Sequence, residues 1–564
     1  MMGFKEFTYV RPDIEKVSAK FKQLTEEFIA AKDAKTQISI VNKVNKESSN
    51  FETMATLVSI RYSINVNDEF YSKENEYIDE ITPYFQACAI NFYKALAASK
   101  FKDDLVAKFG QHLFDIVDQA LLTFDEKIIT ELQEENKLCS EYSKLIANAK
   151  IKYKGNVYTL TQMTPFAQSK DRKERKAVAK LTSKFFEENE AEFDRIYDSL
   201  VKVRTTMGQK MGFDNYLPLG YLRMGRTDYG PKEVGCYRDQ IAKDVVPLAH
   251  KLMKKQFKRI GVRSPKSYDT TLEFLDGNAT PKGTEEELVN KALNMYKELS
   301  PETGIFFTHM IENDLLDLSS KNGKRGGGYC TFISNYKTPF IFANFNGTSH
   351  DVDVLTHEAG HAFQMYCSKD INVPEYILPT LEACEIHSMS MEFFTWPWRE
   401  DFFKEDTNKY KYSHLSGAIT FLPYGACVDH FQEWVYTHST ATPDERKVAW
   451  RELEQKYTPW KKYDIEFLNK GTVWYRQSHI FTSPLYYIDY TLAQVCALQF
   501  WALDQKNHDL AFKRYIKLCK MGGKYSFLEL VNKSSLKNPF VDGTIKKTLV
   551  PVKKWLNNID DIKL

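Results

Sequence analysis

The sequence predicts a mainly α-helical protein with only a minor sheet. From about Asp13 to Gly155, apolar residues recur at helical spacing while Gly and Pro are scarce. Helical patterns return after Asp351 and continue to the C-terminus. Strand-like segments are few. The clearest single helix has an apolar stripe that we expect to pack in the core, formed by Phe193, Ile196, Tyr197, Leu200 and Val201.

Composition and charge indicate a large globular protein and argue against several classes of partner. The chain has 564 residues, of which 43% are hydrophobic and 27% charged, so disordered and collagen-like chains are excluded. Because 77 Lys and Arg are balanced by 75 Asp and Glu, the formal charge is only +2, and no nucleic acid or anionic membrane is expected as a partner.

Cysteine usage and the absence of long apolar runs favour a cytoplasmic enzyme. The nine cysteines are scattered singly without a C-x-x-C pair, which is typical of reduced thiols. The N-terminal residues lack the apolar run of a secretory signal. No later stretch reaches the roughly 18 to 20 apolar residues that cross a bilayer.

Along the chain, we expect an N-terminal helical region over residues 1–150 and a second region over 151–564, both parts of one continuous body. Ile151 to Leu160 is predicted to form a small hairpin that turns at Gly155. Two β-rich runs between Gly326 and Asn346, broken around Pro339, predict a small sheet just before residue 350. The nearly all-apolar segment Leu485 to Leu503 predicts a buried helix.

One motif stands far above the background. His357, Glu358 and His361 spell H-E-x-x-H, and histidines four residues apart share one helix face, where both can bind one ion at about 2.0 to 2.1 Å. The intervening Glu358 lies beside the metal rather than on it, in position to take a proton from a water as it attacks. The motif therefore predicts one catalytic Zn²⁺ ion.

The helix that carries the motif has two informative neighbours. Ser349 is positioned to cap its start, and Asp351 and Asp353 place negative charge in its first turn. Gly360 costs the helix about 1 kcal/mol relative to Ala, which indicates that another backbone or a substrate approaches closely there.

A catalytic zinc site needs a third protein ligand. Three glutamates lie on one stripe of the next predicted helix, which begins near Pro379 and ends at Pro397, so their spacing does not identify the ligand. The glutamates are Glu382, Glu385 and Glu392. The apolar residues around them leave little solvated face, and buried carboxylates require a cation or a hydrogen-bond partner.

The segments HEAGHAFQ and EACEIHSMSME together resemble the thimet oligopeptidase and oligoendopeptidase F family of zinc metallopeptidases, closest to the bacterial oligoendopeptidase F-like branch. The similarity extends roughly from Ile151 to the C-terminus. The resemblance implies that Glu385 is the third metal ligand and that Glu392 orients a ligating histidine. It also implies a helical ellipsoid split by a deep channel, with a small β-sheet beside the metal helix and residues 1–150 in the channel wall.

The same resemblance assigns further residues. The strand that includes Gly327, Gly328 and Tyr329 is expected to lie beside the cleft and bind an extended peptide, although an ordinary hairpin tip is an equal alternative. His479 and Tyr490 are expected to stabilise the oxyanion of peptide hydrolysis. The neighbouring tyrosines, expected to contact substrate, are Tyr486 and Tyr487. Aromatic core packing competes with these roles for each tyrosine.

The sequence thus predicts a cytoplasmic zinc oligoendopeptidase that acts on short unstructured peptides. One rival is a non-catalytic peptide-binding protein with the same helical shell; another is a helical metallocarboxypeptidase, which also uses H-E-x-x-H. The sequence leaves open the cleavage preference and the oligomeric state.

Overall fold

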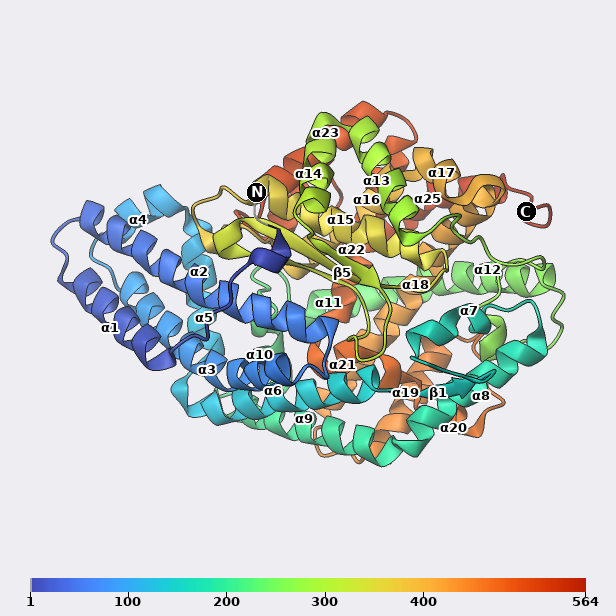
Figure 1. Cartoon of the computed structure of the whole chain (residues 1–564), viewed down its shortest axis with the longest axis horizontal. Coiled ribbons are helices and arrows are strands. Elements are labelled where there is room, and N and C mark those ends of the chain that lie inside the picture. The colour runs from blue at the N-terminus through green and yellow to red at the C-terminus, as the bar shows by residue number, and fades with distance from the viewer. Residues whose placement is uncertain (1–2) are drawn as a thin grey trace.

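The computed structural model describes residues 3–564 and confirms a mainly α fold with two small sheets (Figure 1). The first quarter of the chain, drawn in blue, forms antiparallel helices toward one end of the molecule. Their bounds are α1 (Ile14–Ala30), α2 (Ala34–Ile64), α3 (Glu69–Ala97), α4 (Lys102–Phe109), α5 (Gln111–Thr123) and α6 (Ile129–Ala147).

Aspartates begin the first three of these helices. The side chains of Asp13, Asp33 and Asp68 each accept a hydrogen bond from a backbone N–H of the first turn, which satisfies a donor that has no partner within the helix. The apolar faces of these helices form a cluster of their own that includes Phe28, Val58 and Phe114. A larger cluster runs through the rest of the molecule.

The predicted hairpin follows α6. Strands β1 (Ile151–Tyr153) and β2 (Asn156–Tyr158) pair antiparallel around Lys154 and Gly155, which both adopt positive φ. The helices after it are α7 (Thr164–Ala167), α8 (Arg172–Glu188), α9 (Glu190–Lys210), α10 (Tyr216–Arg223), α11 (Pro231–Gln240), α12 (Val246–Arg259), α13 (Glu285–Leu299) and α14 (Pro301–Glu312). A π-helical turn, Ile241–Val245, joins α11 to α12.

The predicted sheet before residue 350 has three strands rather than two. Its order is β3-β5-β4, with β3 (Leu316–Ser319) parallel to β5 (Thr338–Phe345) and β4 (Tyr329–Ile333) antiparallel to it. Pro339 lies inside β5 opposite Phe332, so the chain breaks between the strands at residues 334–337 and not at the proline. The strand β3 escaped prediction because it is only four residues long.

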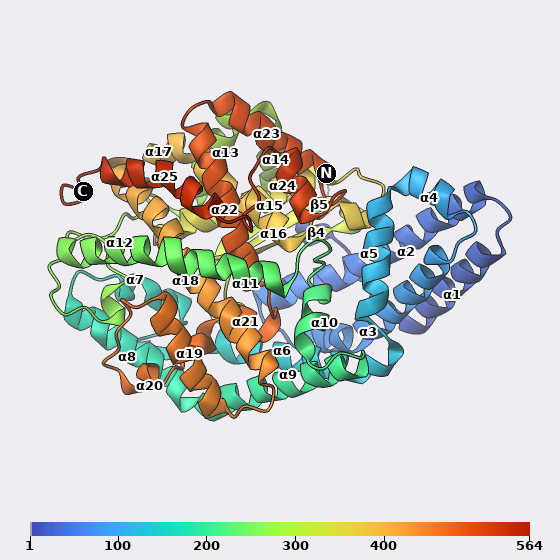
Figure 2. The ribbon, with the colours of Figure 1, turned by 180° about the vertical axis from the view of Figure 1, so that it is seen from behind.

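The remaining helices follow the sheet along the chain, and the first of them packs against β4 and β5. They are α15 (His350–Ser368), α16 (Leu381–Phe394), α17 (Arg399–Phe403), α18 (Thr407–Thr437), α19 (Pro443–Tyr457), α20 (Glu466–Asn469), α21 (Ser478–Thr482), α22 (Tyr487–Asp504), α23 (His508–Met521), α24 (Phe527–Lys533) and α25 (Thr544–Asn557). Viewed from behind, α16 and α22 run through the middle of the molecule (Figure 2). As predicted, α22 is buried over most of its length.

The cysteines and the hydropathy of the helices agree with the sequence-based expectations. Every one of the nine cysteines is a free thiol. Among residues 3–564, we find no helix whose length and hydropathy would allow it to cross a bilayer.

Candidate metal centre

The helix α15 carries the H-E-x-x-H motif. Ser349 occupies its N-cap position, but the hydroxyl makes no capping hydrogen bond, so that prediction is wrong. Asp351 holds the preceding turn instead, because its carboxylate accepts from the backbone N–H groups of Asn346 and Gly347 at 2.9 and 2.7 Å. The turn that precedes α15 is thus fixed by a side chain whose negative charge also interacts favourably with the helix dipole.

Gly360 explains how α15 and α16 come close enough to share a site. A Cβ atom at this position would lie 2.6 Å from the Cα of Ser388 and 2.7 Å from the carbonyl oxygen of His387, both on α16. The predicted close approach at Gly360 is confirmed, and the approaching group is the backbone of α16. Only glycine allows the two helices this separation.

Three candidate ligand atoms converge between these helices. The Nε2 atoms of His357 and His361 lie 3.1 and 3.4 Å from Oε2 of Glu385, and the ligand atoms of all three residues lie within 4.8 Å of one another. Two atoms bound tetrahedrally to one zinc at about 2.0 to 2.2 Å lie about 3.3 to 3.6 Å apart. The donor types and separations therefore fit a zinc ion.

The carboxylate of Glu385 is buried and has partners on both oxygens. Tyr486 donates its hydroxyl proton to Oε1, and Ser388 donates to Oε2 at 2.8 Å. Burial alone would raise the pKa of Glu385, but His361 and His357 hold that pKa well below its usual range. An ionised carboxylate at this position is the form that binds a metal.

Glu392 holds His357 in the orientation that metal binding needs. Its Oε1 accepts from Nδ1 of His357 at 2.7 Å, which directs Nε2 of that imidazole toward Glu385 and His361, where a neutral imidazole would offer its lone pair to a metal. Its Oε2 accepts from Nε2 of His414 at 2.7 Å. Burial would raise the pKa of Glu392, but these two hydrogen bonds lower it to about 2.

The indole of Trp396 fixes the tautomer of His414. An indole N–H can only donate, and Nε1 of Trp396 donates to Nδ1 of His414 at 3.1 Å. The proton of neutral His414 therefore resides on Nε2, where it is donated to Glu392. A chain of hydrogen bonds thus runs from Trp396 through His414 and Glu392 to His357.

Glu358 lies beside the three ligand atoms without contacting them. It is 6% exposed, and its Oε2 is buried with no hydrogen-bond partner among the described residues. Its Oε1 lies 3.1 Å from the point where a Cβ of residue 328 would be, so Gly328 leaves room for this carboxylate. Burial raises the pKa of Glu358 above its ordinary value. A buried, unpartnered carboxylate suits a proton acceptor.

His479 and Tyr490 form a second hydrogen-bonded chain. Tyr424 donates to Oε1 of Gln477 at 2.9 Å, so the amide nitrogen of Gln477 faces Nδ1 of His479, to which it donates at 2.8 Å. The proton of neutral His479 is then on Nε2, 3.1 Å from the Tyr490 hydroxyl. Because His479 donates to Tyr490, the phenolic proton of Tyr490 remains free for another acceptor.

The other predicted residues lie in three settings. Tyr487 makes only aromatic contacts among the described residues, with Phe421, Tyr424, His479 and Tyr490. Gly327 adopts a φ of +89° just before β4, and Tyr329 begins that strand, with its ring stacked on Phe342. Glu382 is fully buried away from the three ligand atoms, and neither of its carboxylate oxygens has a partner among the described residues.

Sequence patterns missed four residues of this centre. His414, Trp396, Gln477 and Tyr424 contact predicted residues only through the folded chain, and none has a spacing that marks it. The best available signal was indirect. Glu392 has two carboxylate oxygens, and a buried glutamate with a single histidine partner leaves one oxygen that requires another donor.

Comparison with known proteins places these features in a family. The profile of peptidase family M3 matches residues 166–548, and the profile of the peptidase M3 N-terminal domain matches residues 4–124. A protein described as an oligoendopeptidase F homolog from Borreliella burgdorferi is 29% identical over 264 residues. That match covers 44% of this chain and only 43% of the relative.

Solved structures match over the whole chain. The structure of PZ peptidase A with inhibitor 2 is 50% identical, covers 99% of this chain and all of its own, and has a TM-score of 0.98. A candidate oligoendopeptidase F from Bacillus anthracis str. Ames is 48% identical over the full length of both chains, with a TM-score of 0.94. The mainly α fold is therefore shared with these proteins.

Proposed function

Because the chain belongs to peptidase family M3, as its resemblance indicated, we propose that it is a zinc-dependent endopeptidase that hydrolyses internal bonds of short, unstructured peptides. The observation that carries this proposal is the convergence of three ligand atoms, on His357, His361 and Glu385, beside the buried free oxygen of Glu358. The names of its relatives, oligoendopeptidase F homolog and PZ peptidase A, support peptide hydrolysis.

The residues present suit one zinc ion. Two imidazole nitrogens and one carboxylate oxygen are a common ligand set of catalytic zinc sites, which keep a fourth position open. When bound there, zinc would polarise the scissile carbonyl and lower the pKa of a water molecule. Glu392, Ser388 and Tyr486 hold the ligands in orientation before any ion arrives.

Glu358 is the general base in this proposal. Its Oε2 takes the proton of the attacking water and later delivers it to the leaving amine. The absence of a hydrogen-bond partner on Oε2 among the described residues supports this role, since a carboxylate oxygen already bound to a donor would be a weaker acceptor.

Tyr490 supplies a proton to stabilise the oxyanion that forms on the scissile carbonyl. Burial raises its pKa well above the ordinary value, so the phenol stays protonated. His479 holds the phenolic oxygen through Nε2, which leaves the O–H of Tyr490 to point elsewhere. A donor of this kind contributes about 3 to 4 kcal/mol where water is excluded.

The strand β4 offers a backbone for an extended peptide. It is an edge strand, since it pairs only with β5 within its sheet. Gly328 adjoins Glu358, so a peptide bound along Gly327, Gly328 and Tyr329 would lie near the general base. This supports substrate binding by strand addition.

The test combines metal analysis with cleavage of one peptide. The purified protein should contain one zinc per chain and cleave an internally quenched peptide whose two ends are blocked. Glu358→Gln should retain the zinc and lose cleavage. Cleavage at full rate by that variant would contradict the assigned base, and hydrolysis only of peptides with free ends would favour an exopeptidase.

A further inference from the structure

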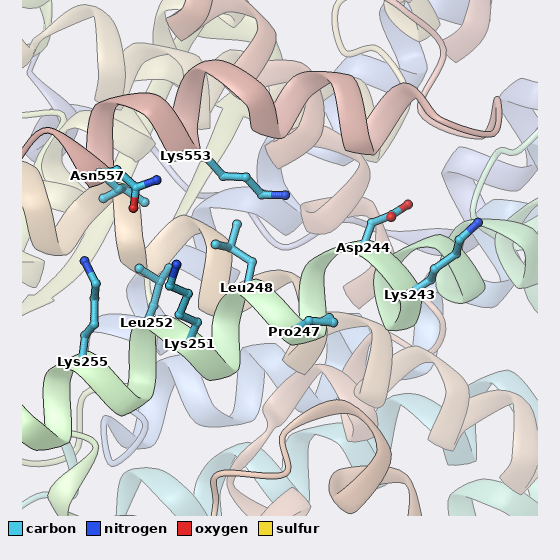
Figure 3. Close-up of a pocket in the computed structure, with 10 residues that line it drawn as sticks. Lys243, Asp244, Pro247, Leu248, Lys251, Leu252, Lys255, Lys553 and Asn557 are labelled. Carbon is cyan, nitrogen blue, oxygen red and sulfur yellow. The ribbon is translucent and has the colours of Figure 1, made fainter.

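A groove outside the candidate metal centre lies between α12 and α25 (Figure 3). Its cavity has a volume of about 420 Å³. The residues that line it are Lys243, Asp244, Pro247, Leu248, Lys251, Leu252, Lys255, Lys553, Leu556 and Asn557. We call this feature the lysine groove, and none of its residues contributes to the chemistry proposed above.

The two helices that form the groove are strongly basic, although the whole chain is nearly neutral. Five basic residues and no acidic ones occur in α12, namely Lys251, Lys254, Lys255, Lys258 and Arg259. Four basic residues and no acidic ones occur in α25, namely Lys546, Lys547, Lys553 and Lys554. Of these nine residues, Lys251, Lys255 and Lys553 line the groove, together with Lys243 from the π-helical turn.

The ammonium groups of the groove have few counter-charges within the chain. The ammonium groups of Lys243, Lys251 and Lys553 form no ion pair or hydrogen bond with any residue of 3–564, and that of Lys255 lies 3.4 Å from Oδ1 of Asp561. Asp244 is the single acidic side chain in the lining. In Figure 3, Lys251, Lys255 and Lys553 extend into the space between the helices. An anion bound there would relieve their mutual repulsion.

The floor of the groove limits the class of anion. It is apolar, because the lining includes Leu248, Leu252 and Leu556, of which Leu252 and Leu556 are buried. No aromatic ring and no arginine line the groove. It therefore lacks side chains that stack on nucleobases and guanidinium groups that form bidentate hydrogen bonds with phosphate. Its concave shape is also a poor match for a flat bilayer.

We propose that the lysine groove binds an acidic peptide segment that carries apolar side chains. Carboxylates of the peptide would lie against Lys251 and Lys553, and an apolar side chain would enter the space above Leu248 and Leu252. Two helix contacts connect the groove with the candidate metal centre. Helix α12 packs on α18, which carries His414, and α25 packs on α22, which carries Tyr490.

The experiment measures peptide binding by fluorescence anisotropy in a background that cannot cleave the probe. All proteins carry Glu358→Gln, and the probe is a labelled peptide of alternating Glu and Leu. The double variant Lys251→Gln, Lys553→Gln should weaken binding by about tenfold, since it removes two ion pairs from the groove. A peptide with Gln in place of Glu should bind at least tenfold more weakly to the unmodified groove.

A charge-matched control separates the groove from the general field of the protein. Lys254→Gln with Lys546→Gln removes the same charge from the same two helices, at exposed lysines outside the lining, and should leave affinity within twofold. Equal weakening by both double variants would overturn the proposal, as would no measurable binding. Tighter binding of RNA or polyphosphate than of the acidic peptide would overturn the assigned class of ligand.

Discussion

His357 and His414 donate to opposite oxygens of one carboxylate, that of Glu392, each over 2.7 Å. The first histidine is a candidate metal ligand and the second lies on α18, so Glu392 ties a distant helix to the metal centre. Partners of this kind fix the tautomer of a ligating imidazole and raise its basicity.

We therefore expect His414→Leu to bind zinc about tenfold more weakly, because Oε2 of Glu392 would lose its donor and the carboxylate could turn away from His357. His414→Gln, whose amide can still donate, should recover part of the affinity. Zinc dissociation constants from competition with a chelator measure both. The matched control is His430→Leu, which removes another hydrogen-bonded histidine from α18. Equal zinc affinity of His414→Leu and the unaltered protein would contradict this role.

Substitution of Tyr490 and of Tyr486 by Phe should affect different properties of the protein, kcat in the first case and zinc affinity in the second. Tyr490→Phe removes the phenolic proton that is free for the oxyanion, so kcat should fall by about 100-fold with little change in KM. Tyr486 donates to Glu385, so Tyr486→Phe should weaken zinc retention more than Tyr490→Phe does. Steady-state kinetics at saturating zinc, with zinc affinity measured in parallel, separate the two effects.

Tyr487→Phe is the control for both variants. Its hydroxyl makes no hydrogen bond among the described residues, so the kcat of this variant should be nearly unchanged. If kcat fell strongly in Tyr487→Phe but not in Tyr490→Phe, Tyr487 rather than Tyr490 would be the tyrosine that stabilises the oxyanion.

The sequence predicted the features that depend on local spacing. The separation of four residues placed the side chains of His357 and His361 on one helix face. Gly360 indicated that another group approaches this helix closely. Spacing left three glutamates equivalent, and only the resemblance selected Glu385. The structure separates them physically, because Glu385 meets the two histidines while Glu382 is buried apart from them.

Contacts between distant segments could not be predicted in this way. The hydrogen bond from His414 to Glu392 depends on how α18 packs, and the pairing of Tyr424 with Gln477 joins residues 53 positions apart. The cap at Ser349 was wrong for a local reason that the sequence does not show. Ser349 adopts helical backbone angles (φ −54°, ψ −27°), and the N–H groups of Asp351 and Val352 already donate to the carbonyl oxygens of Thr348 and Ser349.

The contact at Gly360 gives a test of stability. Gly360→Ala would place a methyl group against Ser388 and the carbonyl of His387, so α15 and α16 must separate. We expect a loss of about 1 to 3 kcal/mol in the free energy of unfolding, measured by denaturant titration. Gly417→Ala is the control, since Gly417 is exposed on α18 and nothing lies within 4 Å of its Cβ position; it should gain up to about 1 kcal/mol. A neutral or stabilising Gly360→Ala would mean that the helices are not in this contact.

His479 should make the protein less stable in mild acid. Burial lowers its pKa from the ordinary 6.5 to about 4, with Arg325 adding to the effect and Glu385 opposing it. Between these two values the unfolded chain binds a proton at this position and the folded chain does not. Stability from this group is therefore present above pH 6.5 and is lost as the pH falls toward 4, by up to about 3 kcal/mol.

His479→Gln removes that proton uptake, so its free energy of unfolding should decline less between pH 6.5 and 4 than that of the unaltered protein. Denaturant titrations at several pH values and one zinc concentration measure the two slopes, with the contribution of zinc common to both. His430→Gln is the matched control. Burial also lowers the pKa of His430 to about 4, so its removal should flatten the slope similarly while leaving kcat unchanged. Parallel slopes for His479→Gln and the unaltered protein would show that His479 is protonated in the folded chain, and a charged imidazole would then donate from both nitrogens, to Tyr490 and toward Gln477.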